Sequence, residues 1–260
     1  MTKNLENAEA ATLFENELAR RGIECRREAE TSRYEIDCEG TTLHVSIDNL
    51  ERGLEQEGDQ DRVERFVDAI VAMTNPGDVA AVGEIYWALE PNDYQELADF
   101  RKPLSDKIDR VLVNYSPARN TISWLSPGHL ATLQLTQEAA EQAANANLAR
   151  TLDEAAWTVD DIDGVKLGYV GCELPFKTSL LLAPNLMQAV QDKIGWPLLA
   201  VAPDRDFLYV WPAEHRDFAG RVGRTVVKEY MEAPYPLSTE VYRIDDDGIV
   251  AIGAFPVPEQ

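Results

Sequence analysis

The amino-acid sequence predicts an α+β protein in which helices cover mainly antiparallel sheets. One observation is a set of segments with apolar residues at helical spacing on one face, the pattern of a half-buried helix. A second is a set of short apolar or alternating segments separated by Gly, Pro and Asp, the pattern of hairpins. The third is size, since 260 residues with 45% hydrophobic residues suffice for one large or two modest globular domains. No Gly/Ser-rich or Pro-rich linker interrupts the chain, so we expect two tightly joined domains, residues 1–150 and 151–260, with a boundary near 150–157.

The first expected domain begins with a helix that ends at Gly22, followed by alternating residues that predict an antiparallel meander. Residues 60–73 carry the clearest amphipathic pattern in the chain. Residues 75–110 are harder to interpret, since EIYWALEP fits either a strand or a short helix. The expected elements are helices over 5–21 and 60–73, a short helix opened by a capping box at 48–51, strands over 23–29, 34–38, 43–47, 111–115 and 121–125, and helices that start at Ser126 and after Thr136.

The second expected domain alternates strands with two helices. Its most apolar part is a hairpin, 198–202 with 207–211, turned by Pro203–Asp206. Both strands of this hairpin are continuously apolar, which predicts a place in the middle of a sheet with both faces covered. The other expected elements are strands over 156–159, 166–170 and 179–182, helices over 184–194 and 214–232, and a final hairpin of 241–244 with 249–252.

The charge of the chain is strongly acidic. Lys and Arg number 24 against 46 Asp and Glu, which gives a formal net charge of −22. A surface of that sign repels phosphate backbones and anionic membranes, so we expect no binding to nucleic acid or to membranes. Solubility is the ordinary reason for such a charge. A docking surface for a basic protein partner is the more specific alternative.

The sequence also predicts a cytoplasmic protein. The N-terminal segment carries acidic residues throughout and has no apolar core of a signal peptide, and the longest apolar runs have the length of strands. The three cysteines, Cys25, Cys38 and Cys172, form a sparse and odd set. Such a set fits reduced thiols better than a disulfide framework.

Several strings, in order along the chain, are similar to those of a known family. They are LHVSIDNL, RVERFVDAIV, RVLVNYSP, LTQEAAEQAANANL, SLLLAPNLMQAV, PDRDFLYVWP and PYPLSTEVYRI, which together span about residues 10 to 250. Their order resembles that of the YtpQ-like proteins, bacterial proteins grouped as a domain of unknown function. The resemblance implies a bacterial, cytoplasmic protein of mixed α and β structure. It implies no activity, and no site residue can be carried over.

Motifs for catalysis, metals or cofactors do not emerge. His44, His129 and His215 are far apart in sequence and lack the spacing of zinc ligands, and no phosphate-binding loop is present. The acidic segments 160–164 and 245–248 end in Asp-Gly, but both lack the first and last ligands of a calcium loop, so we expect β-turns. Cys172 could pair with His215 as a nucleophile, although a small buried thiol is the more common case.

One cluster of residues predicts a binding surface. Arg205 lies in an expected turn, Trp211 ends an expected strand, and Tyr235 lies between two prolines that stiffen the backbone. Tyr, Trp and Arg are enriched at binding hot spots. We expect Arg205 and Tyr235 to reach solvent. The alternative is that all three residues pack the core of the second domain.

These observations favour a noncatalytic, acidic interaction protein whose second domain binds another protein. One alternative is a hydrolase or transferase with a site built from scattered carboxylates. Another is a chaperone or immunity-type protein that masks a basic partner.

Overall fold

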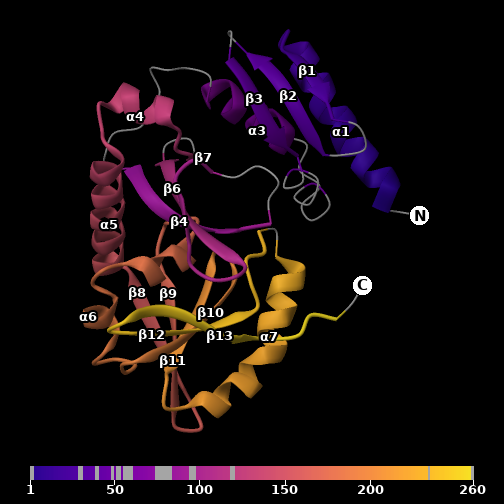
Figure 1. Ribbon diagram of the computed structural model, residues 1–260. Coiled ribbons are helices and arrows are strands. Elements are labelled where there is room, and N and C mark those ends of the chain that lie inside the picture. The colour runs from indigo at the N-terminus through magenta and orange to yellow at the C-terminus, as the bar shows by residue number, and fades with distance from the viewer. Residues whose placement is uncertain are drawn as a thin grey trace. The chain divides into compact units, whose positions relative to one another are not determined.

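The computed structural model describes residues 3–28, 32–38, 41–47, 50, 54, 61–73, 84–93, 98–117, 121–233 and 235–258. The chain divides into two compact units, Met1–Val79 and Ala80–Gln260. Both units combine helices with antiparallel sheets (Figure 1), so the predicted α+β class is confirmed.

The described residues of the first unit include the helices α1 and α3 and a three-stranded sheet. Helix α1 (Lys3–Arg20) precedes the meander β1 (Glu24–Arg27), β2 (Arg33–Cys38) and β3 (Thr41–Ser46), and α3 (Asp61–Met73) follows it. The strands pair in the predicted order β1-β2-β3. Phe14, Ile36 and Val67 are fully buried in a core that α1, α3 and the sheet share. The capping box expected at 48–51 lies largely outside the described residues.

The second unit begins with a four-stranded sheet of order β4-β6-β5, with β7 paired to β6. The segment EIYWALEP, which fitted either a strand or a short helix, forms the strand β4 (Ile85–Pro91). Its residues 85–90 are all buried, so the polar-apolar alternation that marks a half-buried strand is missing. The remaining elements of this part are β5 (Arg101–Pro103), β6 (Ile108–Ser116), β7 (Thr121–Trp124), α4 (Pro127–Leu133) and α5 (Gln137–Glu154). Ser126 and Thr136 cap α4 and α5 as predicted.

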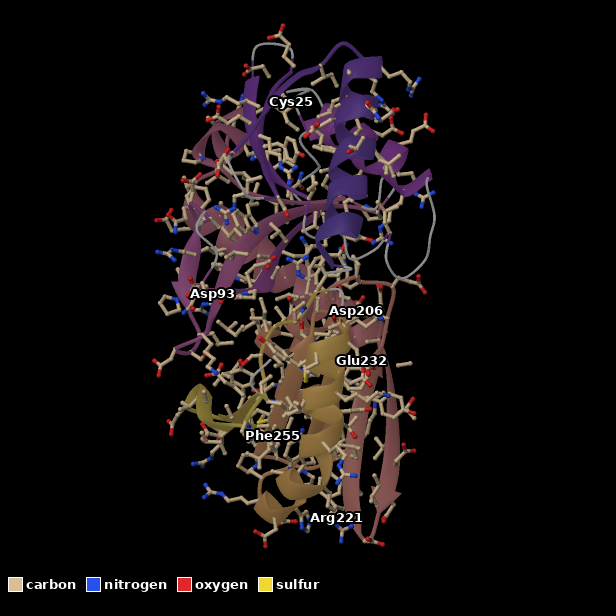
Figure 2. The ribbon with its side chains drawn as sticks, turned by 90° about the vertical axis from the view of Figure 1, so that its right-hand side faces the viewer. Cys25, Asp93, Asp206, Arg221, Glu232 and Phe255 are labelled. Atoms are coloured by element: carbon tan, nitrogen blue, oxygen red, sulfur yellow. The ribbon has the colours of Figure 1, made fainter. Side chains whose placement is uncertain are left out.

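A six-stranded antiparallel sheet forms the rest of the second unit, in the order β13-β12-β10-β11-β9-β8. The apolar hairpin β10 (Leu198–Asp204) and β11 (Phe207–Pro212) occupies its middle, as predicted. Leu199 and Val201 face the cluster that includes helix α7 (Ala219–Glu232), whereas Leu198 and Ala200 face the larger core. Phe255, after the last strand, lies against α7 (Figure 2). The outer strands are β8 (Ala156–Ile162), β9 (Val165–Gly171), β12 (Glu240–Asp245) and β13 (Gly248–Ala254).

Three expected elements differ from the structure. The strand expected over 179–182 is part of a 3₁₀ helix, η3 (Lys177–Leu182), in which Thr178–Leu181 are buried. A short apolar run does not distinguish a strand from a buried helical turn by periodicity. The helix expected over 184–194 is helical only in α6 (Leu186–Val190), and the one expected over 214–232 consists of a 3₁₀ turn, η4 (Arg216–Phe218), followed by α7.

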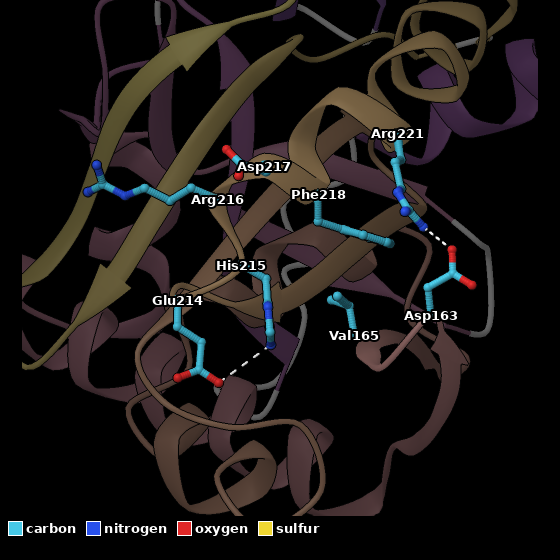
Figure 3. A pocket seen from close by; sticks show the side chains of 8 residues that line it. All are labelled: Asp163, Val165, Glu214, His215, Arg216, Asp217, Phe218 and Arg221. Atoms are coloured by element: carbon cyan, nitrogen blue, oxygen red, sulfur yellow. Dashed lines mark hydrogen bonds and ion pairs between the residues drawn. The ribbon is translucent and has the colours of Figure 1, made fainter.

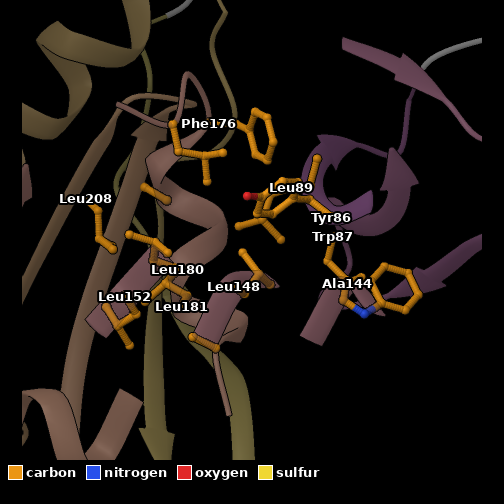
Figure 4. Packing of buried hydrophobic residues seen from close by; sticks show 14 of the residues in the cluster. Tyr86, Trp87, Leu89, Ala144, Leu148, Leu152, Phe176, Leu180, Leu181 and Leu208 are labelled. Atoms are coloured by element: carbon orange, nitrogen blue, oxygen red, sulfur yellow. The ribbon is translucent and has the colours of Figure 1, made fainter. Parts of the chain in front are cut away.

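The boundary expected near 150–157 is not where the compact units divide. Helix α5 crosses that position and packs on β4 and on η3. Leu148 and Leu152 of α5 share one core with Leu180 and Leu181 of η3 (Figure 4). Residues 80–150 therefore complete the core of the C-terminal part rather than that of the N-terminal part.

Candidate functional site

Arg205 is held inside the second unit by a buried carboxylate. Its Nη2 donates to both Oε1 and Oε2 of Glu90 on β4, at 2.6 and 2.5 Å. The Glu90 side chain is 4% exposed and that of Arg205 17%. The guanidinium carbon also lies 4.9 Å from the centre of the Tyr235 ring, within the range of a cation–π contact. The expectation that Arg205 and Tyr235 lie together is correct, but both are half-buried rather than freely exposed.

The turn that contains Arg205 also forms hydrogen bonds through its backbone, with Thr178 and with Tyr235. The carbonyl oxygen of Arg205 accepts hydrogen bonds from the backbone N–H and the hydroxyl of Thr178, at 3.1 and 3.0 Å. The N–H of Arg205 donates to the carbonyl oxygen of Tyr235 at 3.3 Å. The turn after β10 thus joins β4, η3 and the segment before β12. These contacts support the alternative in which Arg205 and Tyr235 are structural residues.

Trp211 is a core residue and not a surface contact. Its side chain has no exposed area, and its ring lies 5.9 Å from that of Phe218, next to α7. The indole Nε1 donates to the carbonyl oxygen of His215 at 3.2 Å. Trp211 is therefore unable to touch a partner in the folded protein. The physical reason is that β11 lies in the middle of the sheet, where both faces are covered.

Glu240 is another buried carboxylate of the second unit, and like Glu90 it was not predicted from the sequence. Oε2 of Glu240 on β12 accepts from the hydroxyls of Ser105, Tyr242 and Ser238, at 2.7, 2.9 and 3.1 Å. Burial and the neighbouring Glu240 carboxylate raise the pKa of Tyr242 well above its ordinary value. Ser105 lies between β5 and β6, so the network ties the two sheets of the second unit together. With 46 acidic residues in the chain, no sequence signal distinguished Glu240 from the others.

Among the described side chains, which leave out that of Cys38, the histidines and cysteines do not lie together. His129 belongs to the cap of α4, where its Nδ1 accepts from the Ser126 N–H at 3.1 Å, and burial lowers its pKa. His215 lies 3.4 Å from the Glu214 carboxylate. Burial raises the pKa of the Cys172 thiol. Within the described ranges, no group of three or more His, Cys, Asp or Glu side chains is arranged to hold a metal ion. The side chain of His44 lies outside them.

The two acidic segments form β-turns, in agreement with the expectation. The Gly164 N–H donates to Oδ1 of Asp161 at 2.8 Å in the β8–β9 hairpin. In the β12–β13 hairpin, the Asp247 N–H donates to Oδ1 of Asp245 at 3.0 Å. Each of these two carboxylates therefore accepts a backbone hydrogen bond within its own turn.

Two of the depressions on the surface of the second unit differ in size and lining. The smaller has a volume of about 290 Å³ and lies between the β8–β9 turn and the start of α7 (Figure 3). Four of the side chains that line it form two pairs, Arg221 with Asp163 and His215 with Glu214. The larger, of about 590 Å³, lies among the β5–β6 region, the segment from η3 to α6, and the β12–β13 hairpin. Among the described residues that line it, Arg110 is the one cationic side chain, and most of the others are apolar.

The two edge strands of the six-stranded sheet differ in composition. β8 carries Asp160 and Asp161, whereas β13 has the sequence GIVAIGA and no charge. On β13, Val250 is 60% and Ile252 45% exposed. In the described part of the chain, no strand pairs with the outer side of β13.

Comparison of the chain with protein-family models, curated proteins and solved structures found no match. The resemblance to the YtpQ-like proteins therefore stays a prediction. None of the helices in the described ranges has both the length and the apolar character needed to span a membrane.

Proposed function

We propose that the protein is a noncatalytic, acidic interaction protein of the cytoplasm, which binds an extended segment of a basic partner protein along β13. The observation that carries this proposal is the uncharged edge strand with exposed Val250 and Ile252. It replaces Arg205, Trp211 and Tyr235 as the binding surface, since these residues contact other parts of the second unit.

Edge strands present unpaired N–H and C=O groups, and proteins usually protect them with charges, prolines or bulges. β8 has such protection in Asp160 and Asp161. β13 has a register shift opposite Val241 and Tyr242, but no charge and no proline between Gly248 and Ala254. A partner segment that adds a strand there would gain main-chain hydrogen bonds, and its alternate side chains would cover Val250 and Ile252.

Charge favours a basic partner over a second copy of this chain. A formal net charge of −22 makes two copies repel each other and attracts Lys- and Arg-rich segments. Asp246 and Asp247, exposed in the hairpin turn, add local negative charge at one end of β13. The fitting partner is therefore a strand-forming segment in which valine-like residues alternate with lysine or arginine.

A labelled peptide of alternating valine and lysine tests the proposal by fluorescence anisotropy with the full chain. We expect it to bind, and a matched peptide of valine and glutamate not to bind. Val250→Lys should weaken binding at least about tenfold, because it places a like charge against the peptide. Ile162→Lys on β8 is the matched control, since Ile162 is also exposed on an edge strand and the substitution changes net charge equally.

Hydrogen exchange supplies a second readout. Amide protons within 248–254 should become protected when the basic peptide binds, while those of β8 should not. Equal loss of binding in both lysine variants would show nonspecific attraction and would contradict the proposal. We also expect no shift of duplex DNA in a gel at physiological salt, since the acidic surface repels phosphates.

A further inference from the structure

We propose that the larger depression is a binding site for a small apolar monocarboxylate, with the guanidinium of Arg110 holding the carboxylate. This proposal is separate from strand addition at β13 and does not rest on it. The depression lies wholly within the second unit.

The size and lining of the depression suit a small apolar ligand. Its volume of about 590 Å³ falls within the range of ligand sites, which are mostly apolar with a few polar groups. The apolar part of the lining includes Leu104, Leu182, Met187, Trp196 and Ile249. An alkyl or aryl group placed there would remove these side chains from water.

Arg110 brings a positive charge to the lining of the depression, together with a buried donor that makes no hydrogen bond. Its Nε is buried and has no hydrogen-bond acceptor, and no ion pair to Arg110 is found among the described residues. The guanidinium carbon lies 5.5 Å from the centre of the Trp87 ring, which limits its movement. Lys102, whose Nζ lies at the same distance from the Trp87 ring, forms an ion pair with Glu141. The Glu141 carboxylate also attracts Arg110 electrostatically, but it does not accept a hydrogen bond from the buried Nε. A buried donor without an acceptor is costly, so an acceptor supplied by a ligand would be stabilising.

Both acidic residues of the same depression contact other side chains of the second unit, although Asp246 hydrogen-bonds to a neutral indole and keeps its negative charge. Asp246 accepts from Nε1 of Trp196 at 2.9 Å, and Asp245 lies 3.0 Å from Nη2 of Arg243. The planar fork of a guanidinium matches the two oxygens of a carboxylate, whereas a phosphate site ordinarily gathers several donors. These points favour a monocarboxylate with an apolar tail.

Isothermal titration of the full chain with three probes of one chain length tests this site. The probes are octanoate, 1-octanol and octylammonium. We expect octanoate to bind more tightly than 1-octanol, and octylammonium to bind least. Arg110→Met should weaken octanoate at least about tenfold and leave 1-octanol unchanged. Arg221→Met removes the same charge from the smaller depression and should leave octanoate binding unchanged.

Circular dichroism establishes that each variant is folded. Arg110→Lys keeps the positive charge without the fork, so it should bind octanoate with an affinity between those of the wild type and Arg110→Met. If Arg110→Met does not fold, the Arg110→Lys variant and the three probes on the wild type decide the matter. Octanoate binding no tighter than that of 1-octanol, or unchanged in the Arg110 variants, would overturn the proposal.

Discussion

Replacing Arg205 with alanine should destabilise the second unit by several kcal/mol, although the residue lies in a surface turn. The substitution removes the cation that faces Glu90, whose side chain is 4% exposed. The carboxylate is then left in the protein interior with no charge to balance it. Breaking a buried ion pair in this way costs about 3–5 kcal/mol.

The structure places the expected value near the lower end of that range. Arg205 is 17% exposed, so water can enter the space that alanine leaves and partly solvate Glu90. Loss of the contact with Tyr235 adds about 0.5–2 kcal/mol. We therefore expect a loss of about 3–4 kcal/mol, which lowers the midpoint of thermal unfolding by roughly 6–16 °C for a unit of this size.

Tryptophan fluorescence during urea unfolding is a suitable assay. All five tryptophans lie between residues 87 and 211, so the signal reports the second unit alone. Arg221→Ala is the control, because its ion pair with Asp163 joins side chains that are 56% and 76% exposed. Exposed pairs contribute less than about 1 kcal/mol.

A double variant separates charge from packing. Arg205→Met combined with Glu90→Leu removes both charges while keeping volume, and it should recover stability to within about 1 kcal/mol of the wild type. A loss below about 1 kcal/mol for Arg205→Ala alone would refute the reasoning. It would mean that the pair is solvated and that Arg205 is available to a partner, as the sequence suggested.

Three further substitutions test the core. Leu208→Asp should unfold the second unit, since Leu208 is 3% exposed and an unpaired buried charge costs several kcal/mol; a normal cooperative transition followed by tryptophan fluorescence would contradict this. Gly168→Ala should lower the free energy of unfolding in urea by about 1–3 kcal/mol, because the new Cβ would lie 2.2 Å from Cδ1 of Ile194. Gly171→Ala is the control, since its nearest atom would lie 3.7 Å away and the substitution should cost little stability. Equal losses of stability in the two variants would show that Ile194 moves aside. Cys172 should react slowly with a thiol reagent at neutral pH until the protein unfolds, because partial burial raises the pKa of its thiol. Cys172→Ala should lower the free energy of unfolding by at most about 1–2 kcal/mol. Rapid modification of the peptide that contains Cys172, detected by mass spectrometry, would contradict the expected protection of the thiol.

Local patterns in the sequence determined most of the elements. The helix over 60–73, the caps at Ser126 and Thr136 and the central apolar hairpin were all predicted from residues close together in the chain. Periodicity, capping and turn formation depend on neighbours within a few positions, so they can be recognised without the fold. The same holds for the acidic turns and for the strongly negative charge.

In other segments the side chains are nearly all buried, and the alternation of polar and apolar residues is therefore missing. EIYWALEP forms the strand β4, in which residues 85–90 are all buried. The apolar run at 179–182 belongs to η3, in which Thr178–Leu181 are buried. When an element has no solvent-exposed face, its polar and apolar residues do not alternate with the period of a strand or of a helix, so its type cannot be predicted from that pattern. The division of the chain after Val79 depends likewise on where α5 packs, which no local pattern records.

The roles of individual polar residues were decided by the tertiary structure alone. Arg205 meets Glu90 across 115 positions, and Ser105 meets Glu240 across 135. The sequence singled out Arg205, Trp211 and Tyr235 by residue type, but whether a side chain binds a partner or its own fold depends on which distant group lies opposite. The buried Nε of Arg110 that makes no hydrogen bond and the uncharged edge of β13 emerge in the same way, because a buried donor and a strand edge exist only once the chain has folded.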